Sequence, residues 1–104
     1  MGQTIHVVQT TLPGSWNEAQ IGQYAQSLLD HGAACVQIQN IRSVYRWNHQ
    51  TESDDEWRIQ LKTSQSNLES LLLKIEETHP YDTPQLISWP ASATDEYGKW
   101  VTSS

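Results

Sequence analysis

The chain has 104 residues, a length that fits one domain over residues 1–104. Its 6 Lys and Arg stand against 12 Asp and Glu, for a formal net charge of -6 without any basic cluster, so nucleic acid and anionic membranes are poor partners. The start has no basic segment before an apolar run, and no stretch reaches the roughly 20 apolar residues that cross a bilayer. The one thiol, Cys35, excludes an internal disulfide. We therefore expect a soluble cytoplasmic protein.

A strand and a helix are predicted at the start. Residues 4–11 are dense in β-branched types and run into Pro-Gly, which predicts a strand with a sharp stop. Ser15 and Glu18 then fit the S-x-x-E capping box of a helix N-terminus. Apolar residues follow at helical spacing until Gly32, which closes the predicted helix.

The middle of the chain predicts a hairpin of residues 33–47 and 56–63. The alternation of the first strand changes phase near Asn40, where we expect a β-bulge, and the acidic residues 48–55 form the expected loop. Tyr45, Trp47 and Trp57 share one phase, so we expect their rings to meet across the strands.

The last third predicts a helix, a strand and a short helix. Ser66 and Glu69 repeat the capping box, and this helix should end by Thr78 because the residue before Pro80 is pushed out of the α region. Residues 85–90 read as a strand and residues 94–101 as a helix capped by Thr94. The order βαββαβ predicts an α+β, ferredoxin-like sandwich, with two helices on one face of a four-stranded antiparallel sheet.

The sharpest candidate site is the corner HPYDTP at residues 79–84. The His79 imidazole could bind a metal or move a proton, with Tyr81 and Asp82 near enough to orient it. The structural alternative is that His79 caps the preceding helix, where a cation favours the helix dipole, while the prolines fix the turn. The sequence supports both interpretations.

Two weaker metal candidates accompany the corner. The Cys35 thiolate would suit a soft metal, although a lone cysteine beside small apolar residues is more often a packing residue. The acidic run of Glu52, Asp54, Asp55 and Glu56 could coordinate a hard cation, but it has no calcium-loop glycine and reads more readily as a solvated hairpin tip.

With these elements placed, the sequence resembles the CutA divalent-cation tolerance family from about Thr4 to Val101. The resemblance is carried by five stretches in order: AACVQI (33–38), SVYRW (43–47), EWRIQLKT (56–63), HPYDTPQLISWP (79–90) and EYGKW (96–100). It implies a ferredoxin-like fold and a tight homotrimer, in which a long hairpin from each subunit extends a neighbour's sheet. It also implies a role in metal tolerance, with copper binding in some members, no enzymatic reaction and no obligatory cofactor.

The same resemblance implies site residues. The histidine of the family's HPY motif falls on His79 and the cysteine of its A-A-C motif on Cys35, while the further first-strand thiol of some bacterial relatives has no counterpart here. We expect Cu(II) or another divalent cation to bind weakly at His79, with help from Asp82 or Glu56. The family's cleft between subunits falls on Tyr45, Trp47, Lys62, His79, Tyr81 and Asp82.

Two other functions fit the same cleft. By analogy with the trimeric PII signal transducers, the cleft could bind a small effector, with Lys62 as its anion-binding group. A protein-interaction scaffold is the third interpretation.

Overall fold

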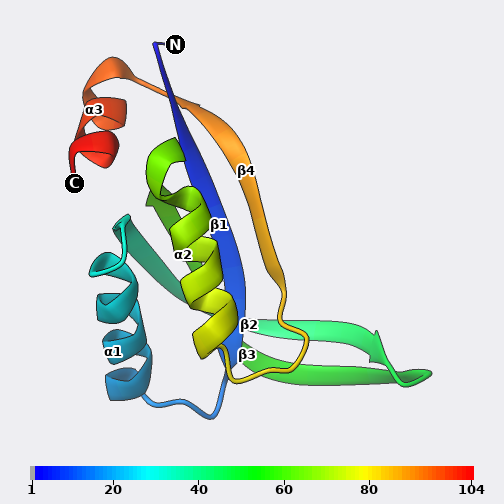
Figure 1. Ribbon diagram of the computed structural model, residues 1–104. Coiled ribbons are helices and arrows are strands. Elements are labelled where there is room, and N and C mark those ends of the chain that lie inside the picture. Colours follow the sequence, from blue (N-terminus) through cyan, green and yellow to red (C-terminus); the bar gives the residue numbers. More distant parts are fainter. Residues whose placement is uncertain (1) are drawn as a thin grey trace.

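The computed structural model describes residues 2–104, and this part of the chain forms four strands and three helices (Figure 1). In chain order they are β1 (Gln3–Pro13), α1 (Glu18–Leu29), β2 (Ala33–Trp47), β3 (Gln50–Thr63), α2 (Gln65–Thr78), β4 (Leu86–Ala93) and α3 (Asp95–Ser103). The strands form one antiparallel sheet in the order β2-β3-β1-β4. The predicted α+β, ferredoxin-like architecture is confirmed. None of these helices is long and apolar enough to cross a membrane, within the described residues.

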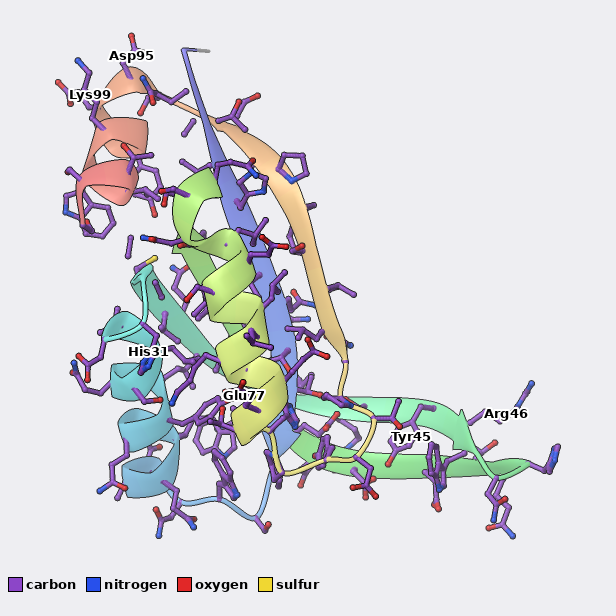
Figure 2. The ribbon with its side chains drawn as sticks, in the orientation of Figure 1. His31, Tyr45, Arg46, Glu77, Asp95 and Lys99 are labelled. Carbon is purple, nitrogen blue, oxygen red and sulfur yellow. The ribbon has the colours of Figure 1, made fainter. Side chains whose placement is uncertain are left out.

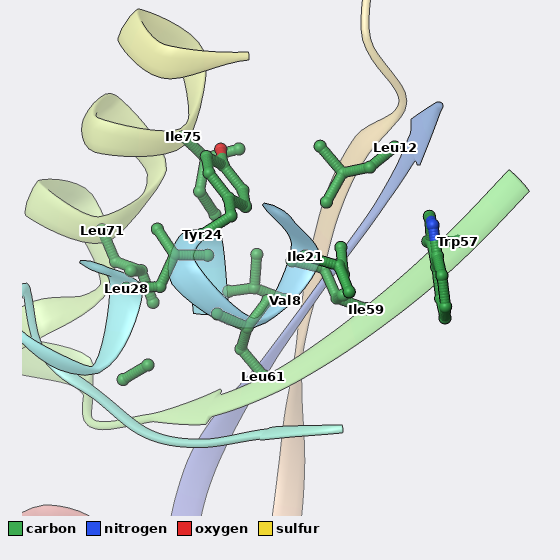
Figure 3. Close-up of a cluster of buried hydrophobic side chains, with 11 residues drawn as sticks. Val8, Leu12, Ile21, Tyr24, Leu28, Trp57, Ile59, Leu61, Leu71 and Ile75 are labelled. Atoms are coloured by element: carbon green, nitrogen blue, oxygen red, sulfur yellow. The ribbon is translucent and has the colours of Figure 1, made fainter. Parts of the chain in front are cut away.

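The main core lies between the sheet and the helices α1 and α2, which run side by side (Figures 1 and 3). Alternation along the strands points Val8 of β1 and Ile59 and Leu61 of β3 to this side, where all three are fully buried. Leu28 of α1 and Leu71 of α2 close over them, also without exposed surface. Burying one such side chain stabilises the fold by about 1.5–3 kcal/mol, so this layer fixes the sheet on which the site is built.

A second, smaller cluster holds α3. Ile5 of β1 packs with Ala93 of β4 and Val101 of α3. Because successive side chains of a strand alternate, Ile5 faces away from the side that Val8 occupies. Gly98 lets α3 approach β1 closely, since a Cβ at this position would lie 2.2 Å from Cβ of Gln3.

The β2-β3 hairpin is longer and more regular than the sequence predicts. Its strands pair as far as Trp47 and Gln50, and a two-residue turn of Asn48 and His49 joins them with φ of 53° and 64°. Two successive positive φ angles match the type I′ turn, whose twist fits a hairpin. The expected loop at residues 48–55 is therefore wrong, since all of its acidic residues belong to β3.

The bulge in β2 also lies elsewhere. The register shifts between Ala33 and Cys35, and no shift interrupts the pairing around Asn40. The change of hydrophobic phase near Asn40 has another cause: β2 is buried or partly buried up to Val36 and largely exposed from Gln37 onward. Beyond the part of the sheet that α1 and α2 cover, neither face of β2 packs against a helix of residues 2–104, so neither face needs to be apolar.

The first two helices begin at other residues than predicted. Asn17 caps α1, accepting from the backbone of Gln20, whose side chain in turn accepts from the backbone N–H of Asn17. Ser64, not Ser66, caps α2 and accepts from the backbone of Asn67. Asn and Gln perform the same reciprocal capping as Ser and Glu, so the S-x-x-E pattern was too narrow.

The later boundaries agree better. Helix α2 ends at Thr78 and Thr94 caps α3, both as predicted. Strand β4 runs on to Ala93, past Pro90, which the predicted strand took as its end. Proline is tolerated there because β4 is an edge strand with a single neighbour.

Candidate functional site

The corner after α2 is held by His79, which lies at the C-cap of the helix with extended backbone angles. Its Nε2 lies 2.8 Å from the carbonyl oxygen of Thr11 and 3.0 Å from Oγ1 of Thr10. Its Nδ1 accepts a hydrogen bond from the backbone N–H of Tyr81 at 3.1 Å. The imidazole thus ties the loop after α2 to the end of β1.

These contacts select one state of the ring. Since Nδ1 of His79 accepts from Tyr81, the proton lies on Nε2 and is donated to Thr11, so the ring is neutral. Burial lowers the pKa of His79, which the hydrogen bond to the Thr11 carbonyl and the charge of Glu56 partly oppose. Neither ring nitrogen offers a free lone pair in this arrangement.

Two tyrosine hydroxyls connect this corner and the hairpin to carboxylates. Tyr81 donates to Glu56 of β3 at 2.8 Å, and Tyr45 of β2 donates to Asp54 of β3. Burial and the hydrogen bond to Glu56 raise the pKa of Tyr81, and the hydrogen bond to Asp54 raises the pKa of Tyr45 to about 12. Both phenols therefore remain neutral donors at physiological pH.

A cleft of about 690 Å³ lies between the hairpin and the loop that follows α2. Its walls combine three aromatic rings with three carboxylates: Tyr45, Trp47, Tyr81, Asp54, Glu56 and Asp82. Figure 2 shows Tyr45 on the part of the hairpin that protrudes from the sheet. Among residues 2–104 no Lys, Arg or His lines this cleft, so its own charge favours a cationic ligand.

The structure brings only some of the predicted site residues together. Tyr45, Trp47, Glu56, Tyr81 and Asp82 line the cleft, and His79 packs against the ring of Tyr81 from outside this lining, with ring centroids 5.1 Å apart.

Cys35 and Lys62 lie elsewhere. They are register partners near the start of β2, six residues along β3 from Glu56, which corresponds to roughly 20 Å. The half-buried Cys35 thiol is 3.8 Å from the hydroxyl of Tyr97, and Lys62 donates to Gln37. Across residues 2–104, no three His, Cys, Asp or Glu side chains come together as a metal-binding group.

The sequence analysis misplaced one residue of the site and missed another. Asp54 was named in the acidic run as a candidate cation ligand but was assigned to a loop, whereas it lines the cleft from β3. The alternation of Glu52, Asp54 and Glu56 continues the phase of β3 and is the signal that could have placed it. Thr10, which donates to the carbonyl of Gln85 at 2.6 Å, had no such signal.

The predicted meeting of three aromatic rings is wrong. Trp57 lies opposite Asn40, is buried beneath the helical layer and donates to the carbonyl of Trp16. Tyr45 and Trp47 pair with Glu52 and Gln50 near the tip instead. This register places odd-numbered residues of β2 on the same face as even-numbered residues of β3, so Tyr45 and Trp47 face the side of the sheet opposite to Trp57.

The sequence was compared with known protein families and known structures. The family model described as CutA1 divalent ion tolerance protein matches residues 6–104. The Divalent-cation tolerance protein CutA of Pectobacterium atrosepticum is 35% identical over 101 residues, covering 94% of this chain and 89% of that protein. The chloroplastic Protein CutA of Arabidopsis thaliana is 37% identical over 101 residues, covering 94% of this chain, and the chain spans about half, 54%, of that relative's length.

The structural comparison agrees. The crystal structure of the divalent ion tolerance protein CutA1 from Ehrlichia chaffeensis superposes with a TM-score of 0.82 at 33% identity, covering 97% of this chain and 94% of that chain.

Proposed function

This chain belongs to the CutA1 divalent ion tolerance family, and from that membership we propose that it takes part in the response to divalent cations by binding them reversibly in the hairpin cleft. The observation that carries the proposal is the charge of the cleft: Asp54, Glu56 and Asp82 line it, and no described residue of opposite charge does. A family of cation-tolerance proteins and an acidic cleft point to the same class of ligand.

The donors suit weak and exchangeable binding. Carboxylate oxygens from two separate elements, β3 and the loop after α2, face the cleft without forming a closed cage. Oxygen donors accept hard divalent cations, and for a given site the first-row divalent ions rank upward to Cu(II). We therefore propose Cu(II) as the tightest of the divalent ligands, held by Glu56 and Asp82. His79 acts by fixing the loop that carries Asp82.

The proposed assembly is a cytoplasmic homotrimer. Large apolar side chains are exposed on the hairpin and on β4, including Val44 at 67% and Ile87 at 47%. Both edge strands, β2 and β4, also leave one side unpaired within the sheet. Exposed apolar surface beside open strand edges is typical of surfaces that other chains cover.

The test is a calorimetric titration with Cu(II) and Zn(II), with light scattering on the same samples. We expect Glu56→Gln to weaken Cu(II) binding about tenfold, because it removes one charge next to the cation. The matched control is Glu69→Gln, which removes an exposed charge on α2 that does not line the cleft. Equal affinity of the two variants would contradict the cleft as the site. A mass other than three times the 11.9 kDa chain would contradict the trimer.

A further inference from the structure

The hairpin cleft is built for more than a metal ion. Its volume of about 690 Å³ lies within the range of sites for small organic molecules, which runs from about 300 to 1,000 Å³. A single metal ion with its oxygen ligands needs far less room. Three of the cleft's eleven lining residues are aromatic, and the indole of Trp47 offers no oxygen atom of the kind that a hard cation prefers.

Two tyrosines of the cleft are hydrogen-bonded to two of its carboxylates. The hydroxyls of Tyr45 and Tyr81 each donate to a carboxylate, of Asp54 and of Glu56. Each hydrogen bond orients one carboxylate oxygen and leaves further acceptor positions on the group, since an ionised carboxylate accepts about four hydrogen bonds. The cleft thus has several free acceptors beside aromatic rings and no donor of positive charge among the described residues.

An ammonium group on an aliphatic chain can contact both the carboxylates and the aromatic rings of the cleft. Its N–H groups donate to carboxylates, its positive charge is attracted to the face of a Trp or Tyr ring, and its methylene groups bury apolar ring surface. Trp gives the strongest attraction of the aromatic residues, and Trp47 is 62% exposed and lines the cleft. A hydrated divalent metal ion would leave Trp47 unused.

The spacing of the carboxylates indicates more than one ammonium group. Asp54 and Glu56 are two residues apart on β3 and therefore lie on the same side of the strand, roughly 7 Å apart along it. Asp82 contributes a third carboxylate from the loop opposite. We propose that the cleft binds a linear aliphatic polyamine, with ammonium groups on the carboxylates of β3 and the loop and the methylene stem against Trp47 and Tyr45. This ligand differs from the one proposed above, and its binding does not depend on metal binding.

The experiment is a calorimetric titration with spermidine at fixed ionic strength, beside titrations with Mg²⁺ and Cu(II). We expect saturable spermidine binding that is tighter than that of Mg²⁺, because Mg²⁺ interacts with the carboxylates but gains nothing from the aromatic rings. In Trp47→Leu the ratio of spermidine affinity to Cu(II) affinity should fall about fivefold, the effect of losing one exposed cation–π contact. The control is Trp100→Leu, which removes another exposed indole, on α3, and should leave the ratio unchanged.

Each outcome decides something. No saturable binding of spermidine, or the same change of ratio in both variants, would overturn the polyamine proposal. If Cu(II) binds and spermidine does not, the polyamine proposal fails and the proposed function stands; if spermidine alone binds, the reverse holds. Should Trp47→Leu misfold or change the mass of the assembly, Tyr45→Leu tests the same aromatic wall.

Discussion

The inner and outer halves of the β2-β3 hairpin are built from the same two strands and have opposite surroundings. In the inner half, Ile59 and Leu61 have no exposed surface beneath α1 and α2. In the outer half, Val44 and Trp47 are 67% and 62% exposed, although the pairing continues to the turn. The backbone hydrogen bonds between β2 and β3 therefore continue beyond the hydrophobic core, whereas the burial of their side chains ends with it.

A difference in stability should follow from this contrast. Backbone hydrogen bonds contribute little net free energy each, whereas buried apolar surface contributes most of the stability of a domain. The inner half should therefore unfold with the whole domain, and the outer half should open locally unless another chain covers it.

The largest expected effect comes from matched truncations in the two halves. Leu61→Ala should lower the free energy of unfolding by about 2–5 kcal/mol, because it leaves a cavity in the core. Val44→Ala should change it by no more than about 0.5 kcal/mol in the isolated chain. Urea denaturation at two protein concentrations would measure both. A large effect of Val44→Ala that grows with concentration would show that another chain buries this residue.

A second, intermediate effect concerns His79, which contacts Thr11 of β1, the residue paired with Arg58 in the inner half of the hairpin. The pKa of His79 is lowered in the folded protein, so the unfolded state binds the proton more readily. Its contribution to stability is complete above the ordinary histidine pKa of about 6.5 and is lost as the pH falls through the lowered value of the folded protein.

The prediction is that the free energy of unfolding falls between pH 7 and pH 5, and that this fall is smaller in His79→Gln. Gln keeps an N–H donor for the carbonyl of Thr11 but does not titrate. The control is His31→Gln, since His31 is exposed at the end of α1 and bonds only within that helix end. Identical pH profiles for His79→Gln and the parent protein would contradict the prediction.

The smallest expected effect lies at the tip. His49 has φ of 64°, a conformation that costs a residue with a Cβ about 1–2 kcal/mol and that glycine adopts freely. The greater freedom of glycine in the unfolded chain offsets about 0.4–1 kcal/mol of the gain, which leaves His49→Gly stabilising by roughly 0.5 kcal/mol. Amide hydrogen exchange of the outer hairpin should slow, and unchanged or faster exchange there would contradict the prediction.

The features predicted best from the sequence are those set by local patterns, such as the alternation of a strand or the residue before a proline. Alternation in Trp57, Ile59 and Leu61 identified the inner strand, and Pro80 ended α2 at Thr78 as expected. The family resemblance, carried by spaced motifs, is confirmed by the family match. The bulge at Ala33 escaped prediction because the change of phase near Asn40 reflects the end of the helical layer, which is a property of the tertiary structure.

The candidate site was predictable in part. The motif at residues 79–84 and Glu56 both contribute residues to the cleft, although they are far apart in the sequence. The partners of His79 are backbone and hydroxyl groups of Thr10 and Thr11, nearly 70 residues earlier. Such contacts depend on where β1 ends relative to α2, and no local pattern encodes that.

Gly98 determines how closely α3 approaches β1, at the end of the sheet away from the hairpin tip. At α1 and α2, closely packed side chains fill the space between the helix and the sheet. At α3 the backbone of residue 98 rests against Gln3, and a single added carbon would collide with it. Helix α3 therefore lies at a distance from β1 that only glycine at position 98 allows, and the same helix brings the hydroxyl of Tyr97 within 3.8 Å of the Cys35 thiol.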